Sequence, residues 1–206
     1  MPGKLYAVSG SIRLFWMSED DRNDYERLLL ETPEARPGYK LEKLTDLYWD
    51  TVLHGEDFNF MIYDDSLGYC GNVSLQHSEN DFPEIGIELF KECRNKGIAP
   101  KAISLMVAEE QKYRKKTAYL VRIAVNNEHC RHVFEKMGAV LVGFDSRDKE
   151  QIDALEQLLN EEKLKKNKDE INYLQRSIDY YTEKSKNICE YKLYISSICD
   201  WMYHIV

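Results

Sequence analysis

The chain has 206 residues, of which 43% are hydrophobic and 31% are charged. This apolar content is enough to bury a normal core in one domain, with or without an appendage. The net charge of -8 argues against a nucleic-acid-binding surface and favours cationic partners, although many proteins are acidic only for solubility.

The cysteines, Cys70, Cys93, Cys130, Cys189 and Cys199, are odd in number and form no Cys-x-x-Cys pair. This pattern indicates reduced thiols in the cytoplasm and not a disulfide framework. The N-terminus has no basic segment followed by an apolar run, and no window approaches about eighteen apolar residues. We therefore expect a cytoplasmic protein with neither a signal peptide nor a membrane span.

The first predicted elements are a strand and two helices. Residues 11–17 are β-branched and aromatic enough for a strand. Ser18 then provides a helix N-cap with Asp21 at the third helical position, and this helix is expected to end at about Glu31. Apolar residues at helical spacing predict a second amphipathic helix over residues 41–52.

Two antiparallel strands are predicted next, over residues 58–63 and 67–76, because an Asp-Asp-Ser turn separates them. Aromatic side chains are frequent in and before these strands. They either line a pocket or fill the core, and the core is the commoner fate of such residues. They are Trp49, Phe58, Phe60, Tyr63 and Tyr69.

The central segment of the sequence is a predicted strand over residues 84–89, a loop over residues 94–99 and a helix to about Ala108. The loop leads the backbone into the helix and leaves several N–H groups without intrahelical partners. A helix start of this kind binds anions.

Two motifs in this order carry a family resemblance. The loop Arg94-x-x-Gly97-x-Ala99 fits the pattern Q/R-x-x-G-x-G/A, and residues 120–139 (LVRIAVNNEHCRHVFEKMGA) follow it with a strand, an Asn, a helix and a closing Gly. In these motifs the chain resembles the GNAT N-acetyltransferases, in particular the ribosomal-protein and spermidine acetyltransferases. The resemblance covers roughly residues 10–145, with a final strand expected near residues 190–196.

The resemblance implies an α/β fold in which helices flank a mixed, mostly antiparallel sheet. The sheet would have about six to seven strands and splay apart between the fourth and fifth. It also implies acetyl-CoA as the cosubstrate and no metal. The fourth strand would contact the pantetheine arm, and the loop and one Asn would bind the phosphate region. These candidate contacts are Ile87, Leu89, Arg94, Asn95, Lys96, Gly97, Ile98, Ala99 and Asn127.

Acetyl transfer needs a base for the amine, donors for the oxyanion and a proton for the leaving thiolate. By the resemblance, Glu84 is the candidate base, and a solvated strand carboxylate is the alternative. Glu88 is the weaker candidate and shares its strand face. Gly86 lies between them, where the strand is expected to splay, and a bulge or close packing would also explain a glycine there.

The proton donor departs from the family pattern. Phe134 stands where the spermidine branch has a Tyr, so no phenol acts there. Cys130 stands where the ribosomal-protein branch has a Ser; it is the candidate acid, with a small buried helix residue as the alternative. Asn127 is a cofactor contact, a helix cap or both. His129 and His132 lack a further ligand at a metal-binding spacing, so we interpret them as a polar helix face.

Residues 146–187 are nearly free of Gly and Pro and show helical spacing. One helix of about 40 residues would extend about 60 Å and could not return to the neighbouring strand. We therefore expect a helical hairpin that turns near residues 166–168, inserted into a GNAT domain of residues 1–145 and 188–206. The hairpin has four possible roles: it packs on the domain, forms a lid beside the active site, forms a homodimer or is a solvated arm. The heptad-like run from Ile171 favours a homodimer.

The leading functional prediction is an acetyl-CoA-dependent acyltransferase that acetylates a primary amine by direct transfer. The acceptor would be a small cationic amine or a protein N-terminus. The alternative is a non-catalytic acyl-CoA-binding module that uses the hairpin as a protein-interaction surface. Turnover, and not binding, separates the two.

Overall fold

The computed structural model describes residues 3–31, 46–145, 149–165 and 168–203. Its centre is an eight-stranded sheet with the order β1-β2-β3-β4-β5-β6-β8-β7. Neighbouring strands are antiparallel except β5 and β6, which are parallel. The strands are β1 (Leu5–Ser9), β2 (Ile12–Trp16), β3 (Phe58–Asp64), β4 (Gly68–Gln76), β5 (Glu84–Leu89), β6 (Ala118–Ala124), β7 (Val140–Phe144) and β8 (Ile188–Tyr194).

The sheet splays apart between β5 and β6, as expected. The two strands share a single register pair, Glu84 with Leu120, and the Leu120 N–H donates to the Pro83 carbonyl at 2.8 Å. Beyond this point the strands diverge toward their C-terminal ends. The backbone edges there are consequently not used by the sheet and face a cavity.

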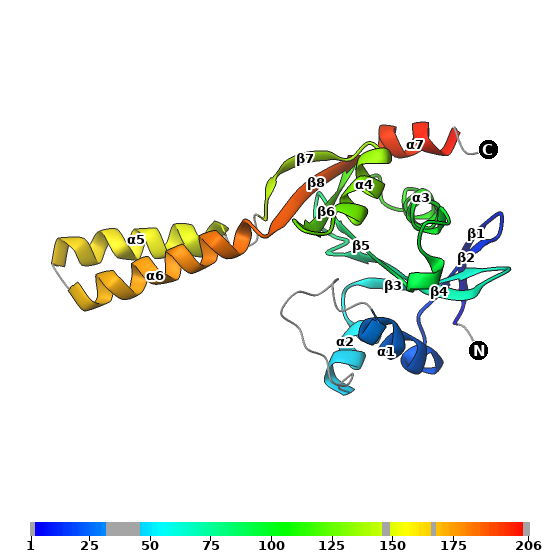
Figure 1. Cartoon of the computed structure of the whole chain (residues 1–206), viewed down its shortest axis with the longest axis horizontal. Coiled ribbons are helices and arrows are strands. Elements are labelled where there is room, and N and C mark those ends of the chain that lie inside the picture. The colour runs from blue at the N-terminus through cyan, green and yellow to red at the C-terminus, as the bar shows by residue number, and fades with distance from the viewer. Residues whose placement is uncertain (1–2, 32–45, 146–148, 166–167, 204–206) are drawn as a thin grey trace.

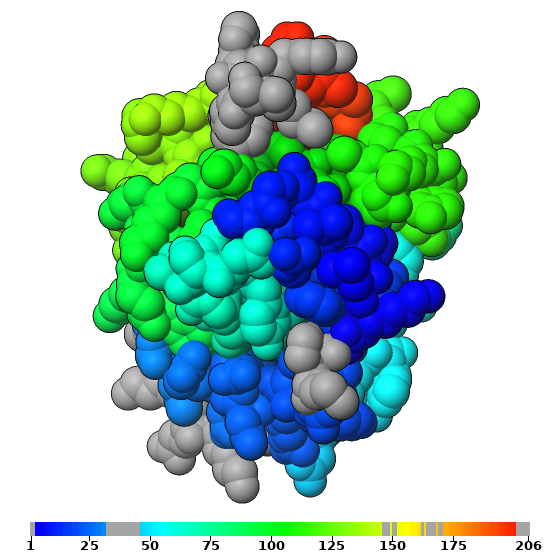
Figure 2. Space-filling view, turned by 90° about the vertical axis from the view of Figure 1, so that its right-hand side faces the viewer, coloured from blue at the N-terminus to red at the C-terminus, as the bar shows by residue number. Residues whose placement is uncertain are grey.

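Helices cover both faces of the sheet (Figure 1). One face carries α1 (Arg22–Glu31) and α2 (Asp46–His54), and the other carries α3 (Ile98–Glu110) and α4 (Glu128–Lys136). Figure 2 faces the β1 edge, where the N-terminal strands occupy the middle and α1 lies below them. Fully buried apolar side chains fill the core, among them Ile12, Leu14, Leu28, Phe60, Ile62, Val73, Leu75, Phe90, Ile103, Met106, Tyr119 and Leu193.

The predicted helix start at Ser18 is confirmed in its capping contacts. The Asp21 carboxylate accepts hydrogen bonds from the Ser18 N–H at 2.8 Å and from its hydroxyl at 2.7 Å. A 3₁₀ turn, η1 (Glu19–Asp21), comes before α1. The second helix is described from Asp46 to His54, and the predicted residues 41–45 lie outside the described part of the chain.

Of the five aromatic residues considered for a pocket wall, Trp49 and Phe60 belong to the buried core, Phe58 and Tyr69 pack against it, and Tyr63 is half-buried. Trp49 and Phe60 are buried, and Phe60 stacks on Tyr6 with ring centroids 4.2 Å apart. Tyr69 packs edge-on against Phe90. Burial raises the pKa of the Tyr69 phenol well above its usual value. This hydroxyl therefore stays protonated at neutral pH.

Two elements were not predicted, and the strand count was too low. β1 is an edge strand whose alternation is weak, since Leu5 and Val8 are exposed and Ala7 is its buried apolar residue. It raises the sheet to eight strands, above the six or seven expected. At the other end the last strand stops at Tyr194, and residues 195–196, predicted as strand, begin α7 (Ile195–Tyr203).

The helical hairpin is present between β7 and β8. It consists of α5 (Lys149–Lys165) and α6 (Lys168–Ser185), and it projects away from the sheet (Figure 1). The two helices bury a small apolar cluster between them, centred on Leu159, Leu174 and Ile178. The turn was predicted near residues 166–168; residues 166–167 lie outside the described part of the chain, and Lys168 begins α6. Because the arm extends outward, packing along the domain does not explain it.

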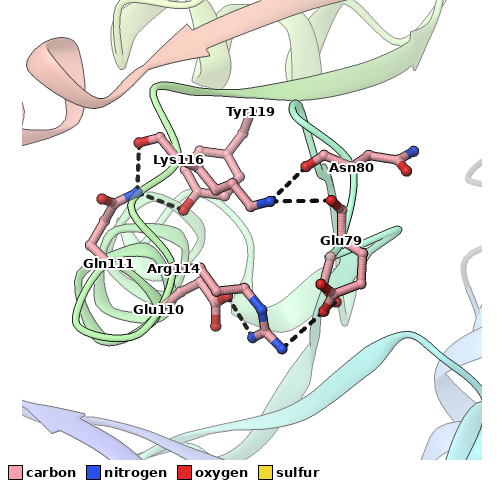
Figure 3. Close-up of polar contacts among 8 residues, drawn as sticks. Glu79, Asn80, Glu110, Gln111, Arg114, Lys116 and Tyr119 are labelled. Atoms are coloured by element: carbon pink, nitrogen blue, oxygen red, sulfur yellow. Dashed lines mark hydrogen bonds and ion pairs between the residues drawn. The ribbon is translucent and has the colours of Figure 1, made fainter.

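A polar cluster ties the loop between β4 and β5 to the end of α3 (Figure 3). Arg114 donates to Glu110 Oε1 at 2.9 Å and to Glu79 Oε1 at 3.2 Å, and Lys116 donates to the Asn80 carbonyl at 2.8 Å. The Glu110 side chain is 4% exposed, so Arg114 compensates a buried carboxylate. The cluster fixes the segment that leads into β5 against the segment that leads into β6.

Within the described ranges, no helix has both the length and the apolar character that a bilayer-spanning segment needs.

Candidate active site

The loop before α3 has the backbone geometry of an anion site. Gly97 is the N-cap of α3 in the left-handed region, with φ 72°. A Cβ built there would meet nothing within 4 Å, so the space in front of the helix is open. The N–H groups of Gly97, Ile98 and Ala99 begin the helix and have no intrahelical acceptor, while Pro100 has no N–H to leave unsatisfied. Backbone donors and the helix dipole therefore point at one open region.

Asn95 takes a backbone conformation in which glycine is the usual residue. Its φ is 61°, also in the left-handed region, where glycine is favoured and Asn is the next best tolerated residue. The neighbouring Arg94 donates from Nε to the Leu89 carbonyl at 3.0 Å, which clamps the loop to the end of β5. Lys96 is exposed at the loop surface.

From this loop a groove of about 380 Å³ extends between α3 and α4; we call it the α3–α4 groove. Its charged side chains are Arg94, Lys136 and Glu88, so two of the three are basic. The lining residues are Ile87, Glu88, Leu89, Arg94, Asn95, Gly97, Ile98, Ala99, Pro100, Asn127, His129, Cys130, His132, Val133, Phe134 and Lys136. The groove therefore joins the predicted cofactor residues of β5, the loop and α4, except Lys96.

Helix α4 forms the second wall of this groove. The Asn127 side chain accepts a hydrogen bond from the Cys130 N–H at 3.1 Å, which confirms the predicted cap. Burial raises the pKa of the Cys130 thiol to about 11, although Arg94 nearby lowers it, so this thiol is protonated at neutral pH. Phe134 is buried at the groove wall.

Sequence reasoning missed several groove residues of α4. His129, His132, Val133 and Lys136 recur at the spacing of one helix face, which is the signal that would have found them. The two histidines belong to this wall. Among the residues described, no group of three or more His, Cys, Asp or Glu side chains is arranged to hold a metal ion.

The splay between β5 and β6 opens a second cavity of about 830 Å³, which we call the V-shaped cavity. It reaches from Cys130 and Phe134 of α4 to Tyr48 of α2, so it connects the two faces of the sheet. Its remaining lining residues are Gln76, Glu84, Ile85, Gly86, Ile87, Glu88, Val121, Arg122, Ile123, Ala124, Val125, Asn126, Asn127, Asp145, Lys184, Asn187 and Ile188. The base of the hairpin thus borders this cavity.

Glu84 lies at the closed end of the V-shaped cavity and is ion-paired with Arg122. The same guanidinium lies 3.0 Å from Glu190 Oε2 and 3.3 Å from Asp145 Oδ1. All four side chains are at most 11% exposed. Three carboxylates surround one cation, and Asp145 and Glu190 flank the two ends of the hairpin.

The third cavity lies on the opposite face from the groove, between the sheet and the first two helices; we call it the α1–α2 pocket. It has a volume of about 150 Å³. Its lining residues are Tyr25, Tyr48, Thr51, Val52, Asp57, Asn59, Asn72, Ser74, Gln76, Gly86, Ile87 and Glu88. The pocket carries two carboxylates and no cationic side chain among the described residues, and so it suits a positively charged group.

Polar side chains of β4, together with Asn59 of β3, line this pocket. Asn72 donates to the Phe60 carbonyl at 3.0 Å, and Asn59 donates to the Val52 carbonyl at 3.0 Å, so their amide oxygens remain as acceptors for the pocket. Gly86 stands opposite Ser74, whose hydroxyl would be 2.5 Å from a Cβ at Gly86. Close packing therefore explains this glycine.

The acetyltransferase (GNAT) domain model matches residues 10–140 of this sequence, which is more than half of the chain. The chain belongs to the GNAT acetyltransferase family. Comparison with the curated proteins gives no match.

Solved structures of acetyltransferases share the fold of this GNAT protein. One is the ribosomal-protein-S5-alanine acetyltransferase from Vibrio fischeri, with a TM-score of 0.55 and 15% identity over 68% of this chain and 85% of that one. Another is the spermidine N-acetyltransferase from Vibrio cholerae in complex with CoA and spermine, with a TM-score of 0.54 and 19% identity over 66% and 85%. A ribosomal L7/L12 alpha-N-protein acetyltransferase in complex with coenzyme A has a TM-score of 0.59 and 13% identity over 70% and 88%.

The residues of this GNAT protein fit an acyl-CoA. The open helix start at Gly97 and the basic Arg94 and Lys136 suit phosphates, and the unpaired edge of β5 suits an extended pantetheine arm. The V-shaped cavity then leads from the groove to the opposite face. The parts of the site therefore lie in the order that a thioester and an approaching amine require.

Proposed function

We propose that this acetyltransferase transfers the acetyl group of acetyl-CoA directly to a primary amine. The observation that carries the proposal is the arrangement of the cavities. The α3–α4 groove holds the cofactor, the α1–α2 pocket holds the acceptor, and the V-shaped cavity joins them across the sheet. The two substrates thus approach from opposite faces, which favours a ternary complex and direct attack.

We propose that the acceptor is cationic. Asp57 and Glu88 line its pocket together with amide and hydroxyl oxygens, and an ammonium group supplies donors for several of them at once. The buried carboxylates around Arg122 add negative charge at the V-shaped cavity. The net charge of -8 attracts the same class of molecule from a distance.

The test is release of free coenzyme A from acetyl-CoA with a panel of amines: spermidine, kanamycin, lysine and a basic peptide with a free N-terminus. Chromatographic detection is used because the protein has free cysteines, of which Cys199 is exposed and would compete for a thiol reagent. We expect release with at least one amine and none with N-acetylated controls. Binding of acetyl-CoA without release for any amine would favour the non-catalytic module, which Phe134 also suggests.

We further propose that the hairpin and the adjoining edge strand β7 form a homodimer contact. β7 ends the sheet with Val140, Leu141 and Phe144 each more than half exposed. On α6, Tyr173 and Tyr180 are 64% exposed and stand two turns apart. Exposed apolar edges of this kind mark association sites.

Deletion of residues 148–186, with a short turn in their place, tests this proposal. Both ends of the deletion keep Asp145 and Glu190, so the contacts of Arg122 are retained. Light scattering should give two chains per particle for the full protein and one for the deletion variant. One chain per particle for the full protein would rule out the dimer.

The free state of all five cysteines suits the reducing cytoplasm that we propose as the location of this protein.

A further inference from the structure

Asp57 lies at the end of the α1–α2 pocket that is away from the path of the thioester. Among the described residues, it is the one charged side chain that lines this pocket and neither of the other two cavities. The residues that the pocket shares with the V-shaped cavity come instead from β5, the end of β4 and α2. An acceptor that reacts at the splay and fills the pocket therefore brings its far end toward Asp57.

The order of the strands gives the separation between Asp57 and the splay. The pantetheine edge belongs to β5, and β4 and then β3 follow it across the sheet. Asp57 comes directly before β3, whose first residue, Phe58, pairs with Leu75 of β4. Two strand spacings separate β3 from β5, which is about 10 Å. A molecule that joins the two places must be several carbon atoms long.

The Asp57 carboxylate is fixed through one of its oxygens. Oδ1 accepts a hydrogen bond from the His77 N–H at 3.0 Å. His77 has φ 51°, in the left-handed region, which a residue with a Cβ adopts only at a cost in energy. The contact therefore holds both the turn after β4 and the carboxylate, and it leaves Oδ2 for a donor in the pocket.

The side chains beside Asp57 supply hydrogen-bond acceptors. Asn59 donates its amide group to the Val52 carbonyl at 3.0 Å, and Asn72 donates to the Phe60 carbonyl at 3.0 Å, so the amide oxygens of both remain as acceptors. No cationic side chain of the described residues lines this pocket. An ammonium group brings several N–H donors and the positive charge that complements Asp57.

Resting on the proposed function, we infer that Asp57 binds a second ammonium group of the acceptor while another amine of the same molecule is acetylated at the splay. The acceptor class is thus an amine with a further cationic group several carbon atoms away. Asp57 sets the specificity for this class and takes no part in the bond changes. A molecule with a single amine lacks the group that this carboxylate binds.

The test compares two amines that differ in the second charge. One is the panel amine that releases coenzyme A fastest, and the other is its analogue with a methyl group in place of the distal ammonium. Norleucine is this analogue for lysine, and hexylamine is the analogue for the diamine cadaverine. Wild-type protein should favour the doubly charged amine by about 10- to 100-fold in kcat/KM, the size expected for a hydrogen bond between charged groups.

Asp57→Asn removes the charge and keeps an oxygen for the His77 N–H. It should lower kcat/KM for the doubly charged amine by about 10- to 100-fold, and leave both the analogue and acetyl-CoA affinity at the wild-type values. Glu56→Gln is the matched control, because this neighbouring carboxylate is exposed and lines none of the three cavities. It should keep the wild-type preference.

Equal kcat/KM for the two amines in the wild type overturns the inference while the proposed function stands. So does a loss in Asp57→Asn that is the same for both amines, or that Glu56→Gln reproduces. If Asp57→Asn does not fold, Asp57→Ser decides, since its hydroxyl also accepts a hydrogen bond: the preference should fall, and an unchanged preference contradicts the inference. Wild-type protein that turns over no amine removes the proposed function as well.

Discussion

Replacement of Gly97 by glutamate is expected to abolish acetyl-CoA binding, with a loss of affinity of about 100-fold or more. Two effects act together. The new carboxylate occupies the open space in front of α3, where it repels phosphates and takes their place at the backbone N–H groups. The residue must also adopt φ 72°, which costs a non-glycine residue about 1–2 kcal/mol. Calorimetric titration of acetyl-CoA measures the loss.

Gly68→Glu is the matched control for this change. Gly68 has φ 76° and also has nothing within 4 Å of a built Cβ, but it lies at the start of β4, away from the groove. It carries the same backbone cost and the same added charge, and acetyl-CoA affinity should stay at the wild-type value. Wild-type affinity in Gly97→Glu would show that phosphates bind elsewhere.

Arg122→Ala is expected to give the largest loss of stability, about 3–5 kcal/mol in the free energy of unfolding. The guanidinium compensates Glu84, Asp145 and Glu190, whose side chains are each at most 11% exposed. Without it, the three buried carboxylates lose the cation that they share. Urea denaturation of the two proteins measures the difference.

Arg13→Ala supplies the control, because Arg13 pairs with Asp65 at the surface, where the two side chains are 40% and 49% exposed. Such a pair contributes about 0–1 kcal/mol. If Arg122→Ala unfolds within about 1 kcal/mol of the wild type, the cluster is not the anchor that we describe. The free energy of unfolding of Arg122→Lys should lie between those of Arg122→Ala and the wild type, since a single ammonium group replaces a planar fork with several donors.

Much of the fold could be predicted because its signals are local. The capping pair Ser18 and Asp21, the loop around Gly97 and the spacing of the hairpin helices are each contained in a few consecutive residues. β1 gave no such signal, because an edge strand with little burial shows no clear alternation. α7 was missed because its first residues are also suitable for the preceding strand.

The site was predictable where it is built from backbone and not where it depends on packing. The loop predicted to bind the cofactor was found from a short sequence motif, and in the structure this loop and Asn127 line the same groove. Arg122, in contrast, is 38 residues from Glu84 and 68 from Glu190, so no local pattern relates them. The position of Glu88 likewise depends on how α1, α2 and α4 border one strand. The catalytic assignments to Glu84 and Cys130 remain predictions.

The most direct measurement of the central claim is intact-mass spectrometry of both the amine and the protein after incubation with acetyl-CoA. Direct transfer across the V-shaped cavity predicts an amine that carries one acetyl group and a protein whose mass is unchanged, including at Cys130. A protein that gains an acetyl group which it then passes to the amine would contradict direct transfer. An amine that stays unmodified across the panel would contradict the assignment of the acceptor pocket.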